Sequence, residues 1–371
     1  MNAPYRSQHR RHGQRGQMIV IAVMSMVTII GGVALVLEAG NAYAHQREVQ
    51  GGADSVANAG ATVIAQRLGG ASRTDGDVAA ATNGLAASNG VGFYRGYYTD
   101  VHGVMMMPNG NLTTNPSAAA RVGDGVIPPG AQGVNVIATQ TFGTTFGRVI
   151  GFNTFSANAD ATSVAGALTG GQILPIVFPV NIVDCSTAGD LGSGETNWQI
   201  SEPGNPPSGQ EYIVPLCKTD GGSFMVLDLD GVSNDCDLEI SQPWRTQFSD
   251  FPVVVNSDNG NNCAKPMVDA VNAFSGQVVL IPICDGDCVT AGGSHATYHV
   301  IRVAAFYLDY MSDQNGGTNL ACVGNGTTLI ALAGNGSSSC LVGWFVRYIT
   351  SGPVGSGPIT GAGAIGIQLV K

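Results

Sequence analysis

Five acidic residues crowd one short stretch in the second half of the chain: Asp228, Asp230, Asp235, Asp237 and Glu239. Carboxylate oxygens gathered at this density are the ligands that calcium prefers. The spacing departs from an EF-hand, because Gly231 stands at the fourth loop position instead of the sixth and Val232 stands at a ligand position. We therefore expect an Asx-rich turn between two strands, with a calcium site as the alternative.

Two other groups of residues have metal-binding chemistry. Cys284, Cys288, His295 and His299 are the ligand types of a tetrahedral zinc site, but the gap between the cysteine pair and the histidine pair is short. A small disulfide loop between the two cysteines is the simpler expectation. Residues 184–188 (DCSTA) follow an apolar run as a D-x-S-x-S metal loop would, with Ala in place of the final Ser, and a strand followed by a turn is expected there.

The sequence shows no local signature of catalysis. It contains no G-x-S-x-G nucleophile elbow, no Walker-type phosphate loop and no dinucleotide fingerprint. We expect a protein that is not an enzyme and that uses no cofactor and no small-molecule substrate. An exported hydrolase that depends on His295 or His299 is the enzyme alternative.

Charge and composition narrow the possible partners. Charged residues make up 11% of the chain, the formal net charge is −10, and the 53 glycines are about twice the usual share. Many turns and few solvated helices are expected from such a composition. Basic residues cluster only near the N-terminus, so nucleic acid is not an expected partner.

All eight cysteines lie beyond residue 184. The even number and this confinement favour disulfides formed in an oxidising compartment, although the sequence leaves their connectivity open. The candidates are Cys185, Cys217, Cys236, Cys263, Cys284, Cys288, Cys322 and Cys340.

An uncharged apolar stretch, residues 18–37, has the length of a membrane-spanning helix, about 30 Å at the helical rise. Four arginines precede it and no acidic residue comes before Glu38, so residues 1–17 should stay in the cytoplasm and the remainder should lie outside. A cleaved signal peptide is the alternative. The run is longer than a typical signal h-region and ends in Glu38, which favours a retained anchor.

The next stretch, residues 38–68, continues as a helix with a stripe of small and apolar residues. Val49, Ala53, Val56, Gly60 and Ile64 recur at three- and four-residue steps, while polar residues fall on another face. This stem helix would lie either on its own domain or against other stems.

The combination of these features resembles the N-terminal module of TadE/TadG-like Flp pilus-assembly proteins. An Arg-rich start, Gly16-Gln17, the apolar span, an acidic residue followed by Gly, and an Ala-rich stem carry the resemblance over residues 10–68. It implies a membrane-anchored structural or assembly component of a bacterial Tad pilus or related envelope apparatus, which contacts other assembly proteins. The anchor and stem residues that it singles out are Gly16, Gln17, Glu38, Gly40, Tyr43, Ala53 and Asp54.

One departure from pilin-like relatives concerns processing. Processed pilins carry Glu five residues after the cleavage point, and counting from Gln17 that position is Ile21. Prepilin processing is therefore not expected. A surface adhesin or calcium-binding exported module, using residues 228–239, is the alternative function.

Beyond the stem we expect an α+β arrangement in two parts. Residues 69–170 should hold a helix over 76–88 that ends at Asn89-Gly90, a strand over 134–141 and a strand pair within 149–167. Glycine-rich residues 166–171 mark a boundary. Residues 171–371 should form a β-rich, antiparallel, sandwich-like domain, with strands in the apolar runs 173–183, 212–216, 223–229, 252–256, 277–283, 298–308 and 341–349.

Overall fold

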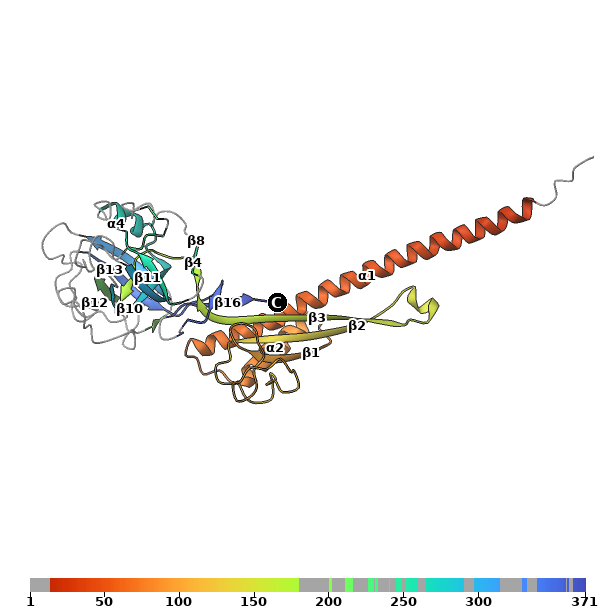
Figure 1. Cartoon of the computed structure of the whole chain (residues 1–371), viewed down its shortest axis with the longest axis horizontal. Coiled ribbons are helices and arrows are strands. Elements are labelled where there is room, and N and C mark those ends of the chain that lie inside the picture. The colour runs from red at the N-terminus through yellow and green to blue at the C-terminus, as the bar shows by residue number, and fades with distance from the viewer. Residues whose placement is uncertain are drawn as a thin grey trace, which may run out of the picture.

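A long helix leads into a sheet-covered stem, and a second β-rich body lies beyond the stem (Figure 1). The computed structural model describes residues 14–179 without a gap. In the second half it describes residues 200–201, 211–215, 226–229, 231–232, 240, 245–248, 251–258, 265–289, 297–313, 329–331, 339–357, 359 and 363–371.

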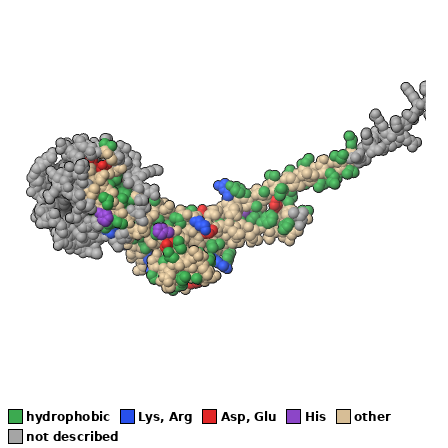
Figure 2. Space-filling model, in the orientation of Figure 1, with side chains coloured by type: hydrophobic (Ala, Val, Ile, Leu, Met, Phe, Trp, Pro, Cys, Tyr) green, Lys and Arg blue, Asp and Glu red, His purple; other side chains and the backbone are tan. Residues whose placement is uncertain are grey.

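Helix α1, Gln14–Leu68, is a single unbroken helix of 55 residues that contains both the predicted span and the predicted stem. It is long and apolar enough to cross a membrane, and none of its most apolar stretch is buried. Hydrophobic side chains gather along this free part of the helix (Figure 2). An uncovered apolar helix of this length is unfavourable in water, so this stretch is a candidate membrane span.

Helix α2, Asp75–Ser88, confirms the predicted second helix and begins one residue earlier than expected. Thr74 and Asp77 form a capping box, in which each side chain satisfies a backbone N–H of the other residue. The hydrogen bond from the Thr74 backbone N–H lowers the pKa of Asp77. The helix ends at Asn89, and Gly90 follows with φ of +66°, as the Asn-Gly signal predicts.

The stem sheet is an antiparallel meander of β1 (Phe93–Thr99), β2 (Gly133–Gly143) and β3 (Thr154–Leu168). The strand predicted over 134–141 is confirmed. The strand pair predicted within 149–167 is wrong, because β3 is a single strand, and its residues 154–164 pair with the full length of β2. Its alternating alanines, Ala157, Ala159 and Ala161, all point to one buried face, and no turn interrupts them.

The second half of α1 packs on this sheet, which is one of the two arrangements predicted for the stem. Val49, Ala53, Val56 and Ile64 are buried with residues of β2, β3 and α2 in one hydrophobic core. A Cβ atom built on Gly60 would lie 2.8 Å from Cγ2 of Val134, so the helix comes closest to the sheet at a residue without a side chain. The narrow small-residue stripe is therefore the face that meets the sheet.

An eight-stranded sheet with strand order β12-β7-β13-β11-β10-β5 forms the outer body, and β6 and β9 pair beside this path. The bounds are β5 Phe178–Pro179, β6 Ile200–Ser201, β7 Glu211–Pro215, β9 Val253–Asn256, β10 Gln277–Val289, β11 Thr297–Asp313, β12 Leu329–Ala331 and β13 Ser339–Val346. Helix α4 (Lys265–Asn272) and a two-stranded sheet of β4 (Gly170–Gln172) and β8 (Arg245–Gln247) complete it. The β-rich, largely antiparallel character is confirmed. Three parallel pairs, β5 with β10, β6 with β13 and β7 with β12, were not predicted.

The chain returns from the outer body to the stem sheet. Strands β14 (Ile349–Ser351), β15 (Val354–Gly355) and β16 (Ile365–Leu369) join that sheet, where β15 and β16 pair with β3. The backbone N–H of Thr169 donates to the carbonyl oxygen of Pro353 at 3.0 Å. The segment that enters the outer body therefore lies beside the segment that leaves it. The outer body is thus an insertion within the stem sheet.

Candidate functional site

Glu38, the residue that directly follows the apolar span, holds the far end of the β2–β3 hairpin. Its carboxylate oxygens accept hydrogen bonds from the backbone N–H of Thr145, at 3.2 and 3.1 Å, and from that of Phe146, at 2.9 Å. A carboxylate that accepts backbone N–H groups makes a charge-assisted bond, which is stronger than a neutral one. The expected polar end of the anchor is therefore also an attachment point for a distant segment.

Residues 144–153 connect β2 to β3, and together with the first two residues of β3, Thr154 and Phe155, they are named the hairpin tip. The hydroxyl of Thr144 donates to the carbonyl oxygen of Phe152, and the N–H of Phe152 donates to the carbonyl oxygen of Gly147 at 2.9 Å. A short 3-10 helix, Gly147–Ile150, ends at Gly151, whose φ of +91° favours glycine. These closures make the tip an ordered turn whose N–H groups face Glu38.

Further contacts join α1 to the hairpin beyond Glu38. The ring of His45 stacks on Phe142 with centroids 4.1 Å apart, and the side-chain amide of Gln46 donates to the carbonyl oxygen of Asn158 at 2.6 Å. Further along α1, the side chain of Asn58 accepts a hydrogen bond from the hydroxyl of Ser163 at 2.6 Å. The helix and hairpin are thus joined by polar and aromatic contacts along the whole stem, in addition to their shared core.

The other predicted anchor and stem residues have simpler surroundings. Tyr43 is exposed, with the guanidinium of Arg47 5.9 Å from its ring centroid, and a Cβ atom on Gly40 would meet only open space. Asp54 is half-buried and accepts a hydrogen bond from Gln50 on its own helix at 2.8 Å. Ala53 is fully buried in the stem core.

Gly16 and Gln17 lie within α1, and their surroundings are outside the described part of the chain. Glu38 is therefore the one polar member of the predicted set with contacts to a distant segment among the described residues.

A buried carboxylate that sequence reasoning missed lies at the start of α2. Asp75 accepts hydrogen bonds from the hydroxyl of Tyr98 at 2.5 Å and from the backbone N–H groups of Gly123 and Gly125, at 2.9 and 2.7 Å. Burial raises the pKa of Tyr98, and its hydrogen bond to Asp75 raises it further. The cluster joins the loop after β1 to α2. Its polar groups are hydrogen-bonded to one another, so its role is structural.

Of the five acidic residues proposed for calcium, the structure describes only Asp228. Its carboxylate accepts from the backbone N–H of Gly231 at 2.6 Å, as in the expected Asx-type turn. The other four, Asp230, Asp235, Asp237 and Glu239, lie outside the described residues. Within the described part of the chain, no three His, Cys, Asp or Glu side chains gather as metal ligands would.

The candidate zinc residues are only partly described. Cys284 is buried in β10 and His299 is half-buried in β11, whereas the side chain of Cys288 and all of His295 lie outside the described set, as do residues 184–188. Among the disulfide candidates, Cys340 is buried in β13. Five of the cysteines lie outside the described residues: Cys185, Cys217, Cys236, Cys263 and Cys322.

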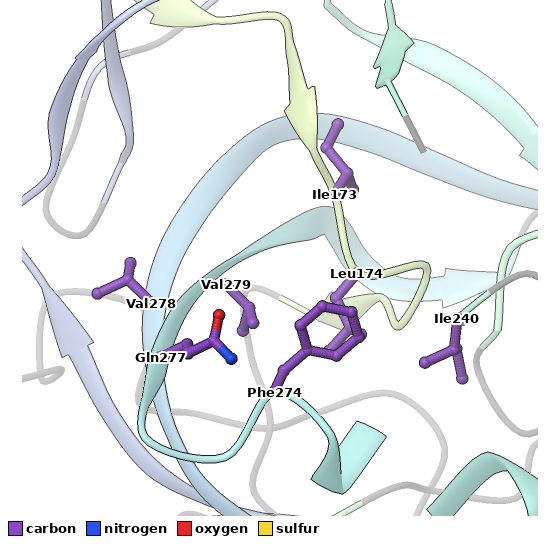
Figure 3. Close-up of a pocket in the computed structure, with 7 residues that line it drawn as sticks. All are labelled: Ile173, Leu174, Ile240, Phe274, Gln277, Val278 and Val279. Atoms are coloured by element: carbon purple, nitrogen blue, oxygen red, sulfur yellow. The ribbon is translucent and has the colours of Figure 1, made fainter. Parts of the chain in front are cut away.

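The outer body contains a small hollow of about 30 Å³ (Figure 3). This volume is about that of one water molecule, far below the several hundred Å³ of a typical ligand site. Gln277 is its one polar lining residue, and the others are Ile173, Leu174, Ile240, Phe274, Val278 and Val279. The hollow is a packing defect beside β10 and carries no chemistry.

Residues 16–63 match a protein-family model described as putative Flp pilus-assembly TadE/G-like. This match confirms the resemblance predicted for the N-terminal module, and it covers both the apolar half of α1 and most of its buried half. No curated protein and no solved structure matches the chain.

Proposed function

We propose that this protein is a single-pass, membrane-anchored structural or assembly component of a Tad (Flp) type pilus or a related cell-envelope apparatus. Residues 1–17 stay in the cytoplasm, residues 18–37 cross the membrane, and the stem and outer body lie outside. The protein acts through contacts with other assembly proteins and not as an enzyme.

The architecture of α1 carries this proposal. The helix is uncovered and apolar over the length of a bilayer, Glu38 ends this apolar stretch, and from Val49 onward the helix is buried against its own sheet. The family match spans this transition. Such a helix supports a role in which the membrane end and the stem form one rigid piece.

The chemistry of the cysteines supports an extracytoplasmic location for the outer body. No described cysteine has a free thiol, and Cys284 and Cys340 are buried within its sheet. Oxidised cysteines persist in compartments outside the cytosol. This agrees with the orientation that the N-terminal arginines predict.

Deletion of the gene in the native bacterium, followed by imaging of surface filaments, tests the role. Loss of filaments, with rescue by the full chain, is expected. A rescue variant with Val27→Asp and Ile30→Asp should fail, because two carboxylates in the middle of the span oppose insertion. The matched control, Val126→Asp in an exposed loop, should rescue. Unchanged filaments in the deletion strain would refute the proposal.

Cross-linking in whole cells addresses the partners. A chain tagged at its C-terminus should recover pilus-assembly proteins from the membrane fraction. Recovery of envelope proteins without any pilus-assembly component would argue for a different apparatus.

A further inference from the structure

We infer that the hairpin tip, residues 144–155, inserts into the outer boundary of the lipid bilayer and forms a second membrane contact beside α1. The inference rests on the proposed membrane anchoring and adds a segment that neither the family match nor the apolar span includes.

The first observation is the position of the tip. Its N–H groups at Thr145 and Phe146 bond to Glu38, and Glu38 directly follows the span. The tip is thereby fixed at the level where the helix leaves the hydrocarbon core. Figure 1 shows the turn of the hairpin reaching past β2 and β3 alongside the free part of α1.

The second observation is what the tip exposes. Val149 is 84% exposed and Phe152 is 58% exposed, and Phe146 and Phe155 are also open to solvent. Hydrophobic side chains gather at this end of the hairpin (Figure 2). A turn outside the cell with four exposed large apolar residues would be poorly solvated unless an apolar phase covers it.

The third observation is charge. Residues 144–155 contain no acidic residue, and their one charged side chain, Arg148, is exposed. Arginine and aromatic side chains are favoured at the bilayer boundary, where the guanidinium reaches phosphate groups and the apolar parts meet acyl chains.

The neighbouring surface of α1 is built for the same depth. Tyr43 lies slightly more than one helical turn beyond Glu38 and is 65% exposed, with Arg47 over its ring. Exposed tyrosine and arginine at this height are typical of the headgroup layer. The occupant that fits a surface continuous with a membrane span, apolar below and aromatic and basic above, is lipid.

Three matched Val→Cys variants of the full chain test the inference in vesicles of phosphatidylethanolamine and phosphatidylglycerol. Val27→Cys lies in the span, Val149→Cys in the hairpin tip and Val126→Cys in an exposed loop of the stem, and all three side chains are exposed in the protein. Each variant is labelled with an environment-sensitive maleimide dye. Lipids with a nitroxide near the headgroup or deep in the acyl chain then quench it, and the unsubstituted chain gives the labelling background.

Blue-shifted emission and quenching are expected at positions 27 and 149 and not at 126. Position 149 should be quenched more by the shallow nitroxide, and position 27 more by the deep one, because interfacial segments bury only about 5 to 10 Å into the boundary. If position 27 is quenched while 149 behaves like 126, the inference fails and the anchor stands. Blue-shifted emission at 149 without lipid quenching means that protein covers the tip, which also overturns the inference. Absence of quenching at position 27 refutes the anchoring proposal itself.

Discussion

Glu38 gives the end of the apolar span a specific structural role. An acidic side chain at the end of an apolar helix can be solvated by water and needs no hydrogen-bond partner from the protein. Instead, its carboxylate binds two consecutive backbone N–H groups of a turn more than a hundred residues away. One side chain therefore joins the end of the apolar span to the hairpin tip.

Replacing Glu38 with Ala should loosen the hairpin tip while leaving the helix intact. Loss of the partly exposed, charge-assisted bonds should cost about 1 kcal/mol locally, so the amides of Thr145 and Phe146 should exchange with deuterium about fivefold faster. Hydrogen exchange of the full chain in detergent measures the effect. Glu48→Ala, which removes an exposed carboxylate paired with His45 on the same helix, serves as the control. Equal exchange in both variants would contradict the role of Glu38.

Tyr98→Phe should weaken the stem and change its response to alkaline pH. The variant removes one hydrogen bond to a carboxylate that keeps two others, a loss of about 1.5 kcal/mol at neutral pH. In the native chain, the pKa of Tyr98 is raised in the folded state. Folding therefore gains stability from this group at low pH, and the gain falls as the pH rises above about 10, where an unfolded tyrosine ionises.

The alkaline loss should be smaller in the Tyr98→Phe variant than in a Tyr97→Phe control, whose hydroxyl does not contact Asp75. Thermal unfolding of both full-length variants in detergent, at neutral pH and above pH 10, provides the comparison. Parallel pH profiles in the two variants would refute the argument from Tyr98.

At the scale of elements, the stem depends on the close approach of α1 to its sheet. Gly60→Ala should destabilise the stem, because the new Cβ would lie 2.8 Å from Cγ2 of Val134 and 3.2 Å from Cγ2 of Thr82. Overpacking of this kind costs about 1 to 3 kcal/mol, more than the roughly 0.5 to 1 kcal/mol that alanine gains over glycine in a helix. Gly51→Ala, on the same helix with open space around it, should be stabilising by that smaller amount. Denaturant unfolding of the two variants should show opposite shifts.

Local periodicity was sufficient to predict the stem helix and β2 but not their long-range partners. The stripe containing Val49 and Ile64 gave α1 its buried face, and the β-branched alternation at residues 134–141 gave β2. The bond between Glu38 and the hairpin tip links segments whose sequences carry no mark of each other, so only the fold reveals it. An apolar turn, Phe146 to Phe152, directly after a polar strand end was the available signal for the tip.

The error at β3 has a similar origin. Its alternating alanines were read together with the preceding apolar turn as two strands, although the turn ends in Gly151 before the strand begins. The buried Asp75 was missed because its partners Tyr98, Gly123 and Gly125 lie 23, 48 and 50 residues further along the chain, and nothing local to Asp75 indicates them.

At the scale of the whole molecule, the return of β14 to β16 makes the outer body removable in principle. Replacing residues 170–352 with a four-residue Gly-Ser turn removes the outer body together with β14, which pairs with β16 at the end of the stem sheet. The change should leave β3 and β15 paired, because Thr169 and Pro353 are already hydrogen-bonded. The shortened chain should keep its stem resistant to protease in detergent, with α1, β2 and β3 protected as in the full chain. Rapid cleavage within β2 or β3 would show that the outer body is needed for the stem to fold.

The sequence could not show this insertion. Residues 365–369 were not among the predicted strands, and nothing local indicates that their partner is β3. A pairing across some two hundred residues is decided by the assembled core, in which Ile365 packs with Ala65 and Ala165.

The contacts between α1 and the β2–β3 hairpin also determine how the molecule would respond to a pulling force. The helix runs from its apolar span toward the outer body, and β3 runs beside it in the same direction (Figure 1). A pull on the outer body would slide the sheet along the helix, so the ties at Glu38, Gln46 and Asn58 would be loaded together in shear and not opened one after another. The stem would therefore resist such a pull through several contacts at once, which suits the proposed attachment of α1 to a membrane.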